Sequence, residues 1–244
     1  MREILTEIDK LQEEINSFRP LPAGTLRQLK EYYRVGLTYT SKAIEGNSLT
    51  ETETKVVLED GITIGGKPIK DYYEALGHSE AYDYIYKIAK DKGITEGDIK
   101  KLHKLFYYRI DEAKAGKYRK GKVFISGSRY PLPGPEKVAE LMKEFMGRLN
   151  ELEKKSHPVE YSAIAHKDLV FIHPFIDGNG RVARLLMNLI LLQNGYCIAI
   201  IPPILRGEYI NTLEKAHTDD KDFREFIVRA VRETQKDYLR LLRT

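Results

Sequence analysis

The residues best suited to chemistry form one short stretch, which ends in two arginines, Arg181 and Arg184. The range Gly178–Gly180 reads Gly-Asn-Gly and lies where the spacing predicts the start of a helix at about residue 181. Glycines allow a tight turn, and the first amides of a helix carry partial positive charge, so this turn can bind an anion. The two guanidinium groups are three residues apart and project from neighbouring faces. Together these features predict a site for several phosphate groups.

Two further residues of the same stretch can serve phosphate chemistry. Asp177 directly precedes the glycine turn and is placed to hold Mg²⁺ against the phosphates. His173 lies upstream, in a turn that Pro174 stiffens, and could take a proton from an attacking hydroxyl. Taken singly, these features are more typical of a packed histidine, a surface turn and solvated arginines. Their combination within twelve residues favours a catalytic site.

Three other kinds of site fit the sequence less well. Residues 178–183 match the Gly-x-Gly-x-x-Gly/Ala dinucleotide fingerprint, but no acidic residue for a ribose occurs between Arg181 and Gly207, and βαβ alternation is missing. The range Ile64–Ile69 lacks the spacing and the Ser or Thr of a Walker loop. The histidines form no His-Glu-x-x-His pattern, so a zinc enzyme is not expected.

One carboxylate is in an unfavourable place for its own helix. Glu45 lies in the last turn of a helix predicted at about 25–46, which Gly46 terminates. A helix C-terminus carries partial negative charge, so a Lys or Arg is expected there and a Glu is disfavoured. The position raises the question of which cation elsewhere in the chain pairs with Glu45.

The composition is that of an ordinary globular protein. The 244 residues are 42% hydrophobic and 31% charged, and the net charge is +4. This small excess allows an acidic or phosphate ligand but does not argue for a nucleic-acid partner. The single cysteine, Cys197, suits a reducing compartment. The N-terminus resembles an amphipathic helix rather than a signal peptide, and polar residues and two prolines interrupt the apolar range 185–205, so a cytoplasmic protein without a membrane partner is expected.

Apolar residues recur at helical spacing along most of the chain, which predicts a mainly α-helical fold. An N-terminal helix should end before the Arg-Pro-Leu-Pro segment that follows residue 18, and a capping box at Thr50 and Glu53 should open another. The further helices are expected near 25–46, 70–92, 96–109, 135–154, 158–170, 181–194, 206–217 and 221–242. Residues 122–135 are typical of a short β-hairpin with an irregular return. The chain shows no convincing linker, so one compact unit is expected.

The stretch His173–Arg184, HPFIDGNGRVAR, resembles the signature of the Fic family of protein adenylyltransferases at every defining position. The similarity extends to AGKYR at 115–119, to residues 157–175 and to EYINTLEKA at 208–216, and it covers roughly residues 70–230. The resemblance implies a helical Fic core with a β-hairpin flap. It also implies an N-terminal helical region at 1–69 that contains an inhibitory helix at about 25–46, a core at 70–230 and a helix end at 231–244.

The reaction that the resemblance implies is transfer of AMP from Mg-ATP to a Ser, Thr or Tyr hydroxyl of a target protein or of the chain itself. His173 would be the general base, and Asp177 would bind Mg²⁺ that bridges the α- and β-phosphates. A relative that transfers a terminal phosphate has Lys in place of the second glycine of the turn. Gly180 therefore favours AMP transfer.

The same resemblance assigns the nucleotide-binding residues of the signature. Asn179 and the flanking amides would form the anion hole, Arg181 would hold the α- and β-phosphates, and Arg184 would hold the γ-phosphate. The full set is Gly178, Asn179, Gly180, Arg181 and Arg184. This assignment agrees with the anion site that the residue types predict on their own.

Two more regions acquire expected roles through the resemblance. The flap would align an extended segment of the target by strand addition, with Ile125 as its main contact residue. Its docking residues would be Val123, Phe124, Ile125 and Ser126. Tyr209 and Leu213 would line the adenine pocket, where His217 replaces an Asn of some relatives. An ordinary surface hairpin and plain core packing are the alternatives for these two regions.

The sequence from Ser41 to Gly46 matches the family's inhibitory motif, a Ser or Thr followed by three residues, Glu and Gly or Asn. The cation that pairs with Glu45 would then be Arg184, and this ion pair would occupy the position that the γ-phosphate needs. A solvated glutamate before a C-terminal glycine is the alternative.

The sequence thus predicts an autoinhibited protein adenylyltransferase with ATP as substrate and Mg²⁺ as cofactor. Two other functions stay open: removal of AMP from a modified protein with the help of Glu45, and a nucleotide-sensing module without turnover. The expected partners are ATP and a target protein that the sequence does not identify, and the N-terminal helices leave room for a homodimer. A nucleic-acid partner is not expected.

Overall fold

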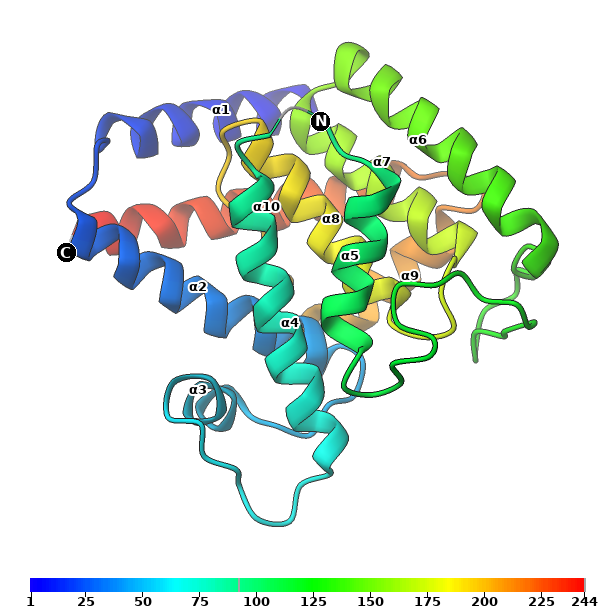
Figure 1. Ribbon diagram of the computed structural model, residues 1–244. Coiled ribbons are helices and arrows are strands. Elements are labelled where there is room, and N and C mark those ends of the chain that lie inside the picture. Colours follow the sequence, from blue (N-terminus) through cyan, green and yellow to red (C-terminus); the bar gives the residue numbers. More distant parts are fainter. Residues whose placement is uncertain (92, 244) are drawn as a thin grey trace.

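The structure is a computed structural model that describes residues 1–91 and 93–243 (Figure 1). Within these residues it contains ten α-helices and two short 3₁₀ helices. The α-helices are α1 (Arg2–Ser17), α2 (Ala23–Ala43), α3 (Glu51–Glu59), α4 (Ile69–Ile88), α5 (Glu96–Tyr107), α6 (Val138–Lys155), α7 (Pro158–Ile172), α8 (Asn179–Gln193), α9 (Arg206–Lys215) and α10 (Lys221–Leu242). The 3₁₀ helices are η1 (Pro135–Lys137) and η2 (Pro203–Leu205). The mainly helical fold is therefore confirmed.

The predicted helices agree with the observed ones to within a few residues. The capping box that opens α3 is present, because the Thr50 hydroxyl accepts the amide of Glu53 and the Glu53 carboxylate accepts the amide of Thr50. The helix expected at 70–92 ends at Ile88, and residue 92 lies outside the described residues, as does residue 244 at the end of the range 231–244.

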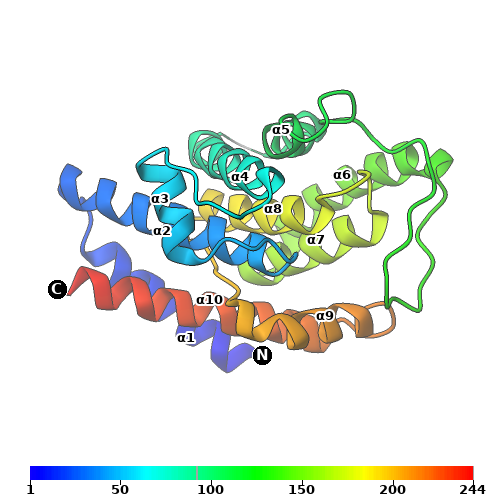
Figure 2. The ribbon, with the colours of Figure 1, turned by 90° about the horizontal axis from the view of Figure 1, so that it is seen from below.

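The helices form layers around α8. Figure 2 shows α4 and α5 on one side of α7 and α8, and α10 and α1 on the other. Residues of α8 are buried along most of its length, among them Val182, Leu186, Leu189 and Ile190. A helix that is apolar on nearly all sides is stable only when neighbours surround it, so α8 forms the centre of the core. Its first two turns carry the two arginines of the predicted phosphate site.

Elements far apart in the sequence meet in this arrangement. The N-terminal helix α1 packs along α10, and α2 packs against α4 with its C-terminal end near α8. The N-terminal region thus lies against the core, and the division into an N-terminal region at 1–69, a core at 70–230 and a helix end at 231–244 within one compact unit stays a prediction. None of the helices among the described residues is long and apolar enough to cross a membrane. Cys197 is a buried free thiol.

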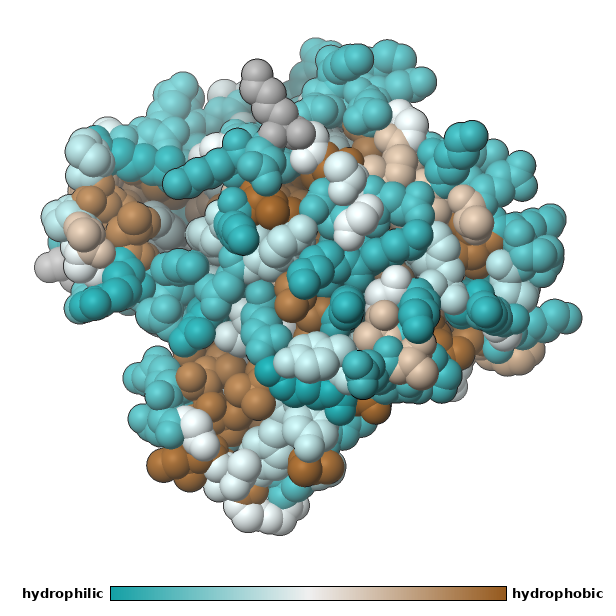
Figure 3. Space-filling view, viewed as in Figure 1, coloured by the Kyte–Doolittle hydropathy of each residue, from teal (hydrophilic) through white to brown (hydrophobic). Residues whose placement is uncertain are grey.

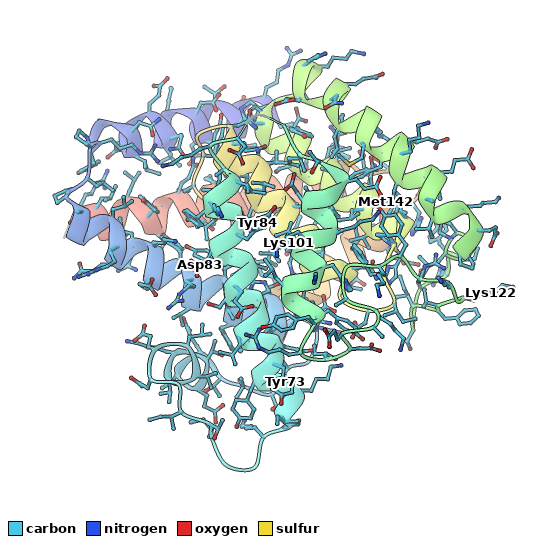
Figure 4. The ribbon with its side chains drawn as sticks, in the orientation of Figure 1. Tyr73, Asp83, Tyr84, Lys101, Lys122 and Met142 are labelled. Atoms are coloured by element: carbon cyan, nitrogen blue, oxygen red, sulfur yellow. The ribbon has the colours of Figure 1, made fainter. Side chains whose placement is uncertain are left out.

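The predicted β-hairpin is not confirmed, because the described residues contain no strand. The segment 120–134, which we call the flap segment, is irregular, with a turn in which the Ser128 amide donates to the Ile125 carbonyl at 3.2 Å. At its tip, the Ser128 hydroxyl and the Arg129 amide donate to the Glu214 carboxylate on α9, at 2.9 and 2.7 Å. These polar groups bond to another element instead of to an opposing strand. Lys122 marks the flap segment at the edge of the molecule in Figure 4.

Most of the face seen in Figure 3 is hydrophilic, with an apolar area beside α3. Two isoleucines in or next to the loop from α3 to α4 have large exposed side chains, Ile62 at 57% and Ile69 at 65%. Isolated apolar side chains on a surface are common, and a contiguous group of them is a candidate contact surface.

Candidate active site

The loop between α7 and α8 is shaped by two unusual backbone conformations. His173 follows the last residue of α7 in the left-handed region, with φ 51° and ψ 59°. Gly178 precedes α8 with φ 79°, a conformation that favours glycine. A side chain at position 178 would also place its Cβ 2.7 Å from the ring of Phe106. Both turns direct the loop so that the amides of the first turn of α8, which lack intrahelical partners, face the same site.

The Asn179 side chain shapes this loop from the inside. Its amide nitrogen donates to the Phe175 carbonyl and its oxygen accepts the Phe175 amide, both at 2.9 Å. These two bonds fix the orientation of the carboxamide and use one of its two N–H groups. The predicted anion hole of Asn179 and the amides near Gly178 and Gly180 therefore stays a prediction.

His103 on α5 braces the same loop, a role that the sequence did not suggest. Its Nδ1 accepts the Gly116 amide at 2.8 Å, so Nε2 carries the proton and donates to the Asp177 carbonyl at 3.2 Å. The imidazole stacks on Phe175 with centroids 3.9 Å apart. Burial lowers the pKa of His103 to about 4, so it stays neutral and keeps this tautomer.

Arg181 is fixed by two carboxylates. Its guanidinium donates to Glu74 on α4 at 2.7 Å and to Asp177 at 3.0 Å, and it lies 4.2 Å from the centre of the Phe106 ring. The residue is 3% exposed, so its orientation is set before any ligand arrives. Glu74 is another site residue that the sequence did not reveal.

Asp177 is the carboxylate with the properties of a Mg²⁺ ligand. Its side chain is 41% exposed, and its Oδ1 accepts the Gly178 amide at 2.6 Å. Burial would raise its pKa, but Arg181, the Gly178 amide and Lys70 outweigh burial and hold the pKa below its usual range. No group of three or more His, Cys, Asp or Glu side chains among the described residues could enclose a metal ion. A single carboxylate suits Mg²⁺, which is commonly held by one or two carboxylates together with waters and substrate phosphates.

Arg184 lies almost completely buried behind the glycine turn, with 2% of its surface exposed. Its Nε donates to the Ser41 hydroxyl at 2.9 Å, and one terminal nitrogen donates to the Ser41 carbonyl at 2.7 Å. The other terminal nitrogen donates to the Tyr209 hydroxyl at 3.2 Å. The first terminal nitrogen also donates to the Glu45 carboxylate, at 2.7 Å. The structure thus brings Ser41 and Glu45 to Arg184 from the far end of α2.

Glu45 lies at the entrance of the glycine turn. A Cβ at Gly180 would be 2.5 Å from the Glu45 carboxylate, so the two groups are in direct contact. Burial would raise the pKa of Glu45, but the guanidinium groups of Arg184 and Arg181 outweigh it and lower the pKa. Gly46, with φ 92°, ends the helical turn. An acid that its own helix end disfavours is therefore stabilised by a buried arginine from another helix.

His173 has the protonation state of a general base. Its Nδ1 lies 3.2 Å from the Val170 carbonyl, a contact that requires the proton on Nδ1 and leaves Nε2 as the acceptor. Burial is the largest influence on its pKa and lowers it, and Arg119 lowers it further. The carboxylates of Glu45 and Asp177 and the Val170 contact act in the opposite direction without outweighing them. The imidazole is therefore neutral at physiological pH.

A cavity of about 150 Å³ joins the glycine turn to α9 and the flap segment. Its lining includes six of the residues that the sequence singled out: Glu45, Ile125, His173, Gly180, Tyr209 and Leu213. Tyr209 supports the wall, because its hydroxyl accepts from Arg184 and lies 3.0 Å from Nε2 of buried His166. His217 also lines the cavity and is stacked between Phe171 and Tyr130, with centroids 3.7 and 4.0 Å away.

The other flap residues lie outside this cavity. Val123, Phe124 and Ser126 do not line it, and Phe124 is 90% exposed. Of the flap residues singled out by the sequence, only Ile125 is brought to the site. The exposed aromatic side chain of Phe124, one residue before the cavity-lining Ile125, remains available for contact with another molecule.

Comparisons with known proteins identify the family. Residues 93–191 match the model of the Fic/DOC family. The protein adenylyltransferase Fic of Drosophila grimshawi is 37% identical over 238 residues, which are 96% of this chain and 49% of that protein. The protein adenylyltransferase Fic of Nematostella vectensis is 37% identical over 239 residues, which are 95% of this chain and 55% of that protein. The chain spans about half the length of the curated relatives it matches.

Solved structures agree in fold. Fic-1 of C. elegans (residues 134–508) superposes with a TM-score of 0.88 at 32% identity, over 98% of this chain and 71% of that one. A Fic domain containing signaling protein from Bacteroides thetaiotaomicron gives a TM-score of 0.88 at 26% identity, over 97% of both chains. The chain belongs to the Fic family, as its signature indicated.

Proposed function

We propose that this chain is an autoinhibited, Mg²⁺-dependent protein adenylyltransferase. It transfers AMP from ATP to a hydroxyl of a target protein and of itself. The observation that carries the proposal is the 2.7 Å ion pair between Glu45 and Arg184, placed against Gly180 on the same turn as His173 and Asp177. The relatives named protein adenylyltransferase Fic support the same chemistry.

In the proposed reaction, a hydroxyl oxygen of the target attacks the α-phosphorus of ATP. A new oxygen–phosphorus bond forms, the bond from the α-phosphorus to the bridging oxygen of the β-phosphate breaks, and pyrophosphate leaves. Nε2 of His173 accepts the hydroxyl proton, which its neutral state allows. The partly exposed carboxylate of Asp177 would hold Mg²⁺, which when bound would supply neutralisation of phosphate charge. Arg181 and the amides of the turn position the α- and β-phosphates, and this positioning is the main source of rate in such transfers.

Inhibition follows from the charge at Arg184. The Glu45 carboxylate already accepts a hydrogen bond from this guanidinium and occupies the place that the γ-phosphate would take. Its negative charge also repels the phosphates of an incoming ATP. The turn that follows α2 must withdraw Glu45 before ATP binds in the reactive orientation. Ser41 remains bonded to Arg184 in this picture, so the guanidinium stays aligned for the phosphate.

The test is labelling with α-labelled Mg-ATP. The variant Glu45→Gly is expected to label itself several-fold faster than the wild type, because Arg184 becomes available to ATP. His173→Ala in the Glu45→Gly background should lose labelling and still bind ATP. Glu112→Gly removes an exposed glutamate from a turn outside the site and should label like the wild type. Equal labelling of wild type and Glu45→Gly would remove Glu45 from the mechanism, and persistent labelling without His173 would require a different base.

A second candidate is removal of AMP from a modified protein. One observation favours it: the Glu45 side chain keeps 36% of its surface exposed and lines the same cavity as His173, so it can orient a water molecule. Incubation of an AMP-modified protein without ATP separates the two reactions. A nucleotide-sensing module without turnover would give no mass increase with Mg-ATP in the Glu45→Gly variant.

The proposed partners are ATP and a target protein whose extended segment lies along the flap segment near Ile125. A homodimer is a further proposal, and the exposed isoleucines Ile62 and Ile69 offer a surface for it. A cytoplasmic location likewise stays a proposal that rests on the sequence.

A further inference from the structure

Arg119 lies between the catalytic loop and the flap segment, and the roles assigned so far do not include it. The residue is 5% exposed, and its side chain donates to three backbone carbonyls. Nε donates to His173 at 2.8 Å, one terminal nitrogen donates to Pro133 at 2.6 Å, and the other donates to Gly121 at 3.2 Å. The Arg119 amide also donates to the Pro174 carbonyl, at 2.9 Å.

The first of these bonds acts on a strained residue. Among the described residues, His173 is the only non-glycine with positive φ. A left-handed conformation costs a residue with a Cβ roughly 1 kcal/mol or more, so neighbouring groups must hold it in place. The bond from Arg119 fixes the His173 carbonyl, and the bond to Pro174 fixes the next peptide. The direction of the imidazole depends on this backbone conformation.

The other two bonds close the base of the flap segment. Gly121 and Pro133 lie at its two ends, and the guanidinium connects them. The flap segment has no strand pairing to hold its ends together. The buried guanidinium of Arg119 can hold them, because its N–H donors point in fixed directions. One planar group therefore sets the position of Ile125 and its neighbours relative to His173.

The charge of Arg119 also acts on the histidine. Burial and the Arg119 charge lower the pKa of His173, while the charges of Glu45 and Asp177, which face it from α2 and from the catalytic loop, raise it. Arginine keeps its charge even when burial lowers its own pKa. The cation therefore helps to keep the imidazole neutral.

We propose that Arg119 is a positioning residue of this reaction: it holds the backbone of the general base in its left-handed conformation and ties that base to both ends of the segment that receives the target. The proposal rests on the proposed function, since it concerns the same base and the same flap segment. It predicts that loss of the guanidinium slows the chemical step without weakening ATP binding, because the hydrogen bonds of the Arg119 side chain go to His173, Gly121 and Pro133 and not to the glycine turn.

The test compares Arg119→Gln and Arg119→Lys in the Glu45→Gly background, with Arg148→Gln, an arginine with a 55% exposed side chain on α6, as the matched control. Arg119→Gln should reduce the maximal rate of self-labelling tenfold or more, while the Mg-ATP concentration for half-maximal rate changes less than twofold. The acidic limb of its pH–rate profile should move to higher pH, because the imidazole pKa rises when the cation is lost. Arg119→Lys keeps the positive charge but loses the forked set of guanidinium hydrogen bonds. Its labelling rate should therefore fall, while the acidic limb of its pH–rate profile stays at the wild-type pH.

A second measurement does not depend on activity. An NMR titration of the histidines in the unliganded protein should show a higher pKa for His173 in Arg119→Gln than in Arg119→Lys or Arg148→Gln, with the signal assigned from its loss in His173→Ala. An unchanged rate and an unchanged His173 pKa in Arg119→Gln would overturn the inference. Equal pH profiles for the Gln and Lys variants would overturn its electrostatic part. Activity that persists in His173→Ala would instead overturn the proposed function, and the NMR comparison would still report on Arg119.

Discussion

At the scale of single residues, the site depends on a buried guanidinium whose hydrogen bonds are mostly to neutral groups. Arg184 donates to the hydroxyl and carbonyl of Ser41 and to the hydroxyl of Tyr209, and Glu45 is the one charged acceptor that its hydrogen bonds reach in the described structure. The neutral acceptors fix its orientation, while the carboxylate supplies the opposite charge. A phosphate that replaces Glu45 therefore meets a guanidinium already in position, which lowers the ordering cost of binding.

Lys42, on α2 and three residues before Glu45, is another buried cation near the site. It is 1% exposed, and its Nζ has no hydrogen-bond partner among the described residues. Burial lowers the pKa of Lys42 to about 8, against the opposing effect of Glu74 and Asp71 and with a small contribution from Arg181. An ammonium group in this place weakens the packing of α2 against α4.

The first prediction at this scale is that Lys42→Met stabilises the protein at neutral pH. A pKa lowered in the folded state means that the unfolded chain binds more protons between pH 8 and 10.5, so wild-type stability rises with pH in that range. The variant should gain at most on the order of 3 kcal/mol below pH 8, and the gain should shrink towards pH 10.5. Chemical unfolding at pH 7 and pH 10 measures both values. Lys143→Met, on an exposed position of α6, should show neither the gain nor its pH dependence.

At the scale of elements, local patterns in the sequence were sufficient to predict the helices. Apolar spacing located them, and the capping box at Thr50 gave the start of α3. The flap segment could not be predicted in the same way, because its form depends on a partner elsewhere. Its tip bonds to Glu214 on α9, which no local pattern in residues 122–135 encodes.

The residues of the candidate site likewise fall into two groups, those that a local pattern predicts and those that only the folded structure brings together. The residues from His173 to Arg184 are contiguous, so their types and spacing are enough to predict an anion site from the sequence. Supports such as His103 and Glu74 come from α5 and α4 and give no signal in the sequence, because each resembles an ordinary helical residue. Arg119 lay within a stretch similar to the family, but only its bonds reveal what it does.

The second prediction concerns the contact between α4 and α5, which hold those supports. A Cβ at Gly77 would lie 2.7 Å from the carbonyl oxygens of Leu105 and Phe106, so the helices meet backbone to backbone there. Figure 4 shows Tyr84 further along α4, where its hydroxyl donates to Asp98 at the start of α5, at 2.7 Å. Gly77→Ala should force the helices apart and destabilise the protein by about 1–3 kcal/mol.

The matched control for Gly77→Ala is Gly147→Ala on α6, where a Cβ meets nothing within 4 Å. That substitution should stabilise the helix by about 0.5–1 kcal/mol, since glycine is a poor helix former. Thermal unfolding measures whether each substitution raises or lowers the stability of the protein. Gly77→Ala should also reduce labelling by the Glu45→Gly form, because Phe106 contacts Gly178 and Arg181. A neutral effect of Gly77→Ala would show that α5 can move without cost to the site.

At the scale of the whole molecule, the proposed inhibition joins two parts of the chain that are far apart in sequence. The end of α2 reaches the start of α8, and α2 is also held by α3 and α4. Arg206, just after η2, donates to the Ile44 carbonyl at 2.6 Å and so fixes the turn that contains Glu45 from a third direction. Release of Glu45 in the proposed mechanism therefore requires movement of the turn that follows α2 and not of one side chain alone.

The last prediction treats this release as an equilibrium that ATP can shift. In Glu45→Gly without ligand, buried Arg184 loses its charged partner, so the melting temperature should fall, by the equivalent of about 1–3 kcal/mol. Saturating Mg-ATP should then raise the melting temperature of Glu45→Gly more than that of the wild type, because ligand binding stabilises by mass action and the wild type must first displace its own carboxylate. Thermal shift assays give the melting temperatures of the wild type and of Glu45→Gly, each with and without Mg-ATP. The control Glu112→Gly should have the melting temperatures of the wild type under both conditions. If Mg-ATP stabilised wild type and Glu45→Gly equally, Glu45 and the nucleotide would not compete for Arg184, whatever the labelling rates.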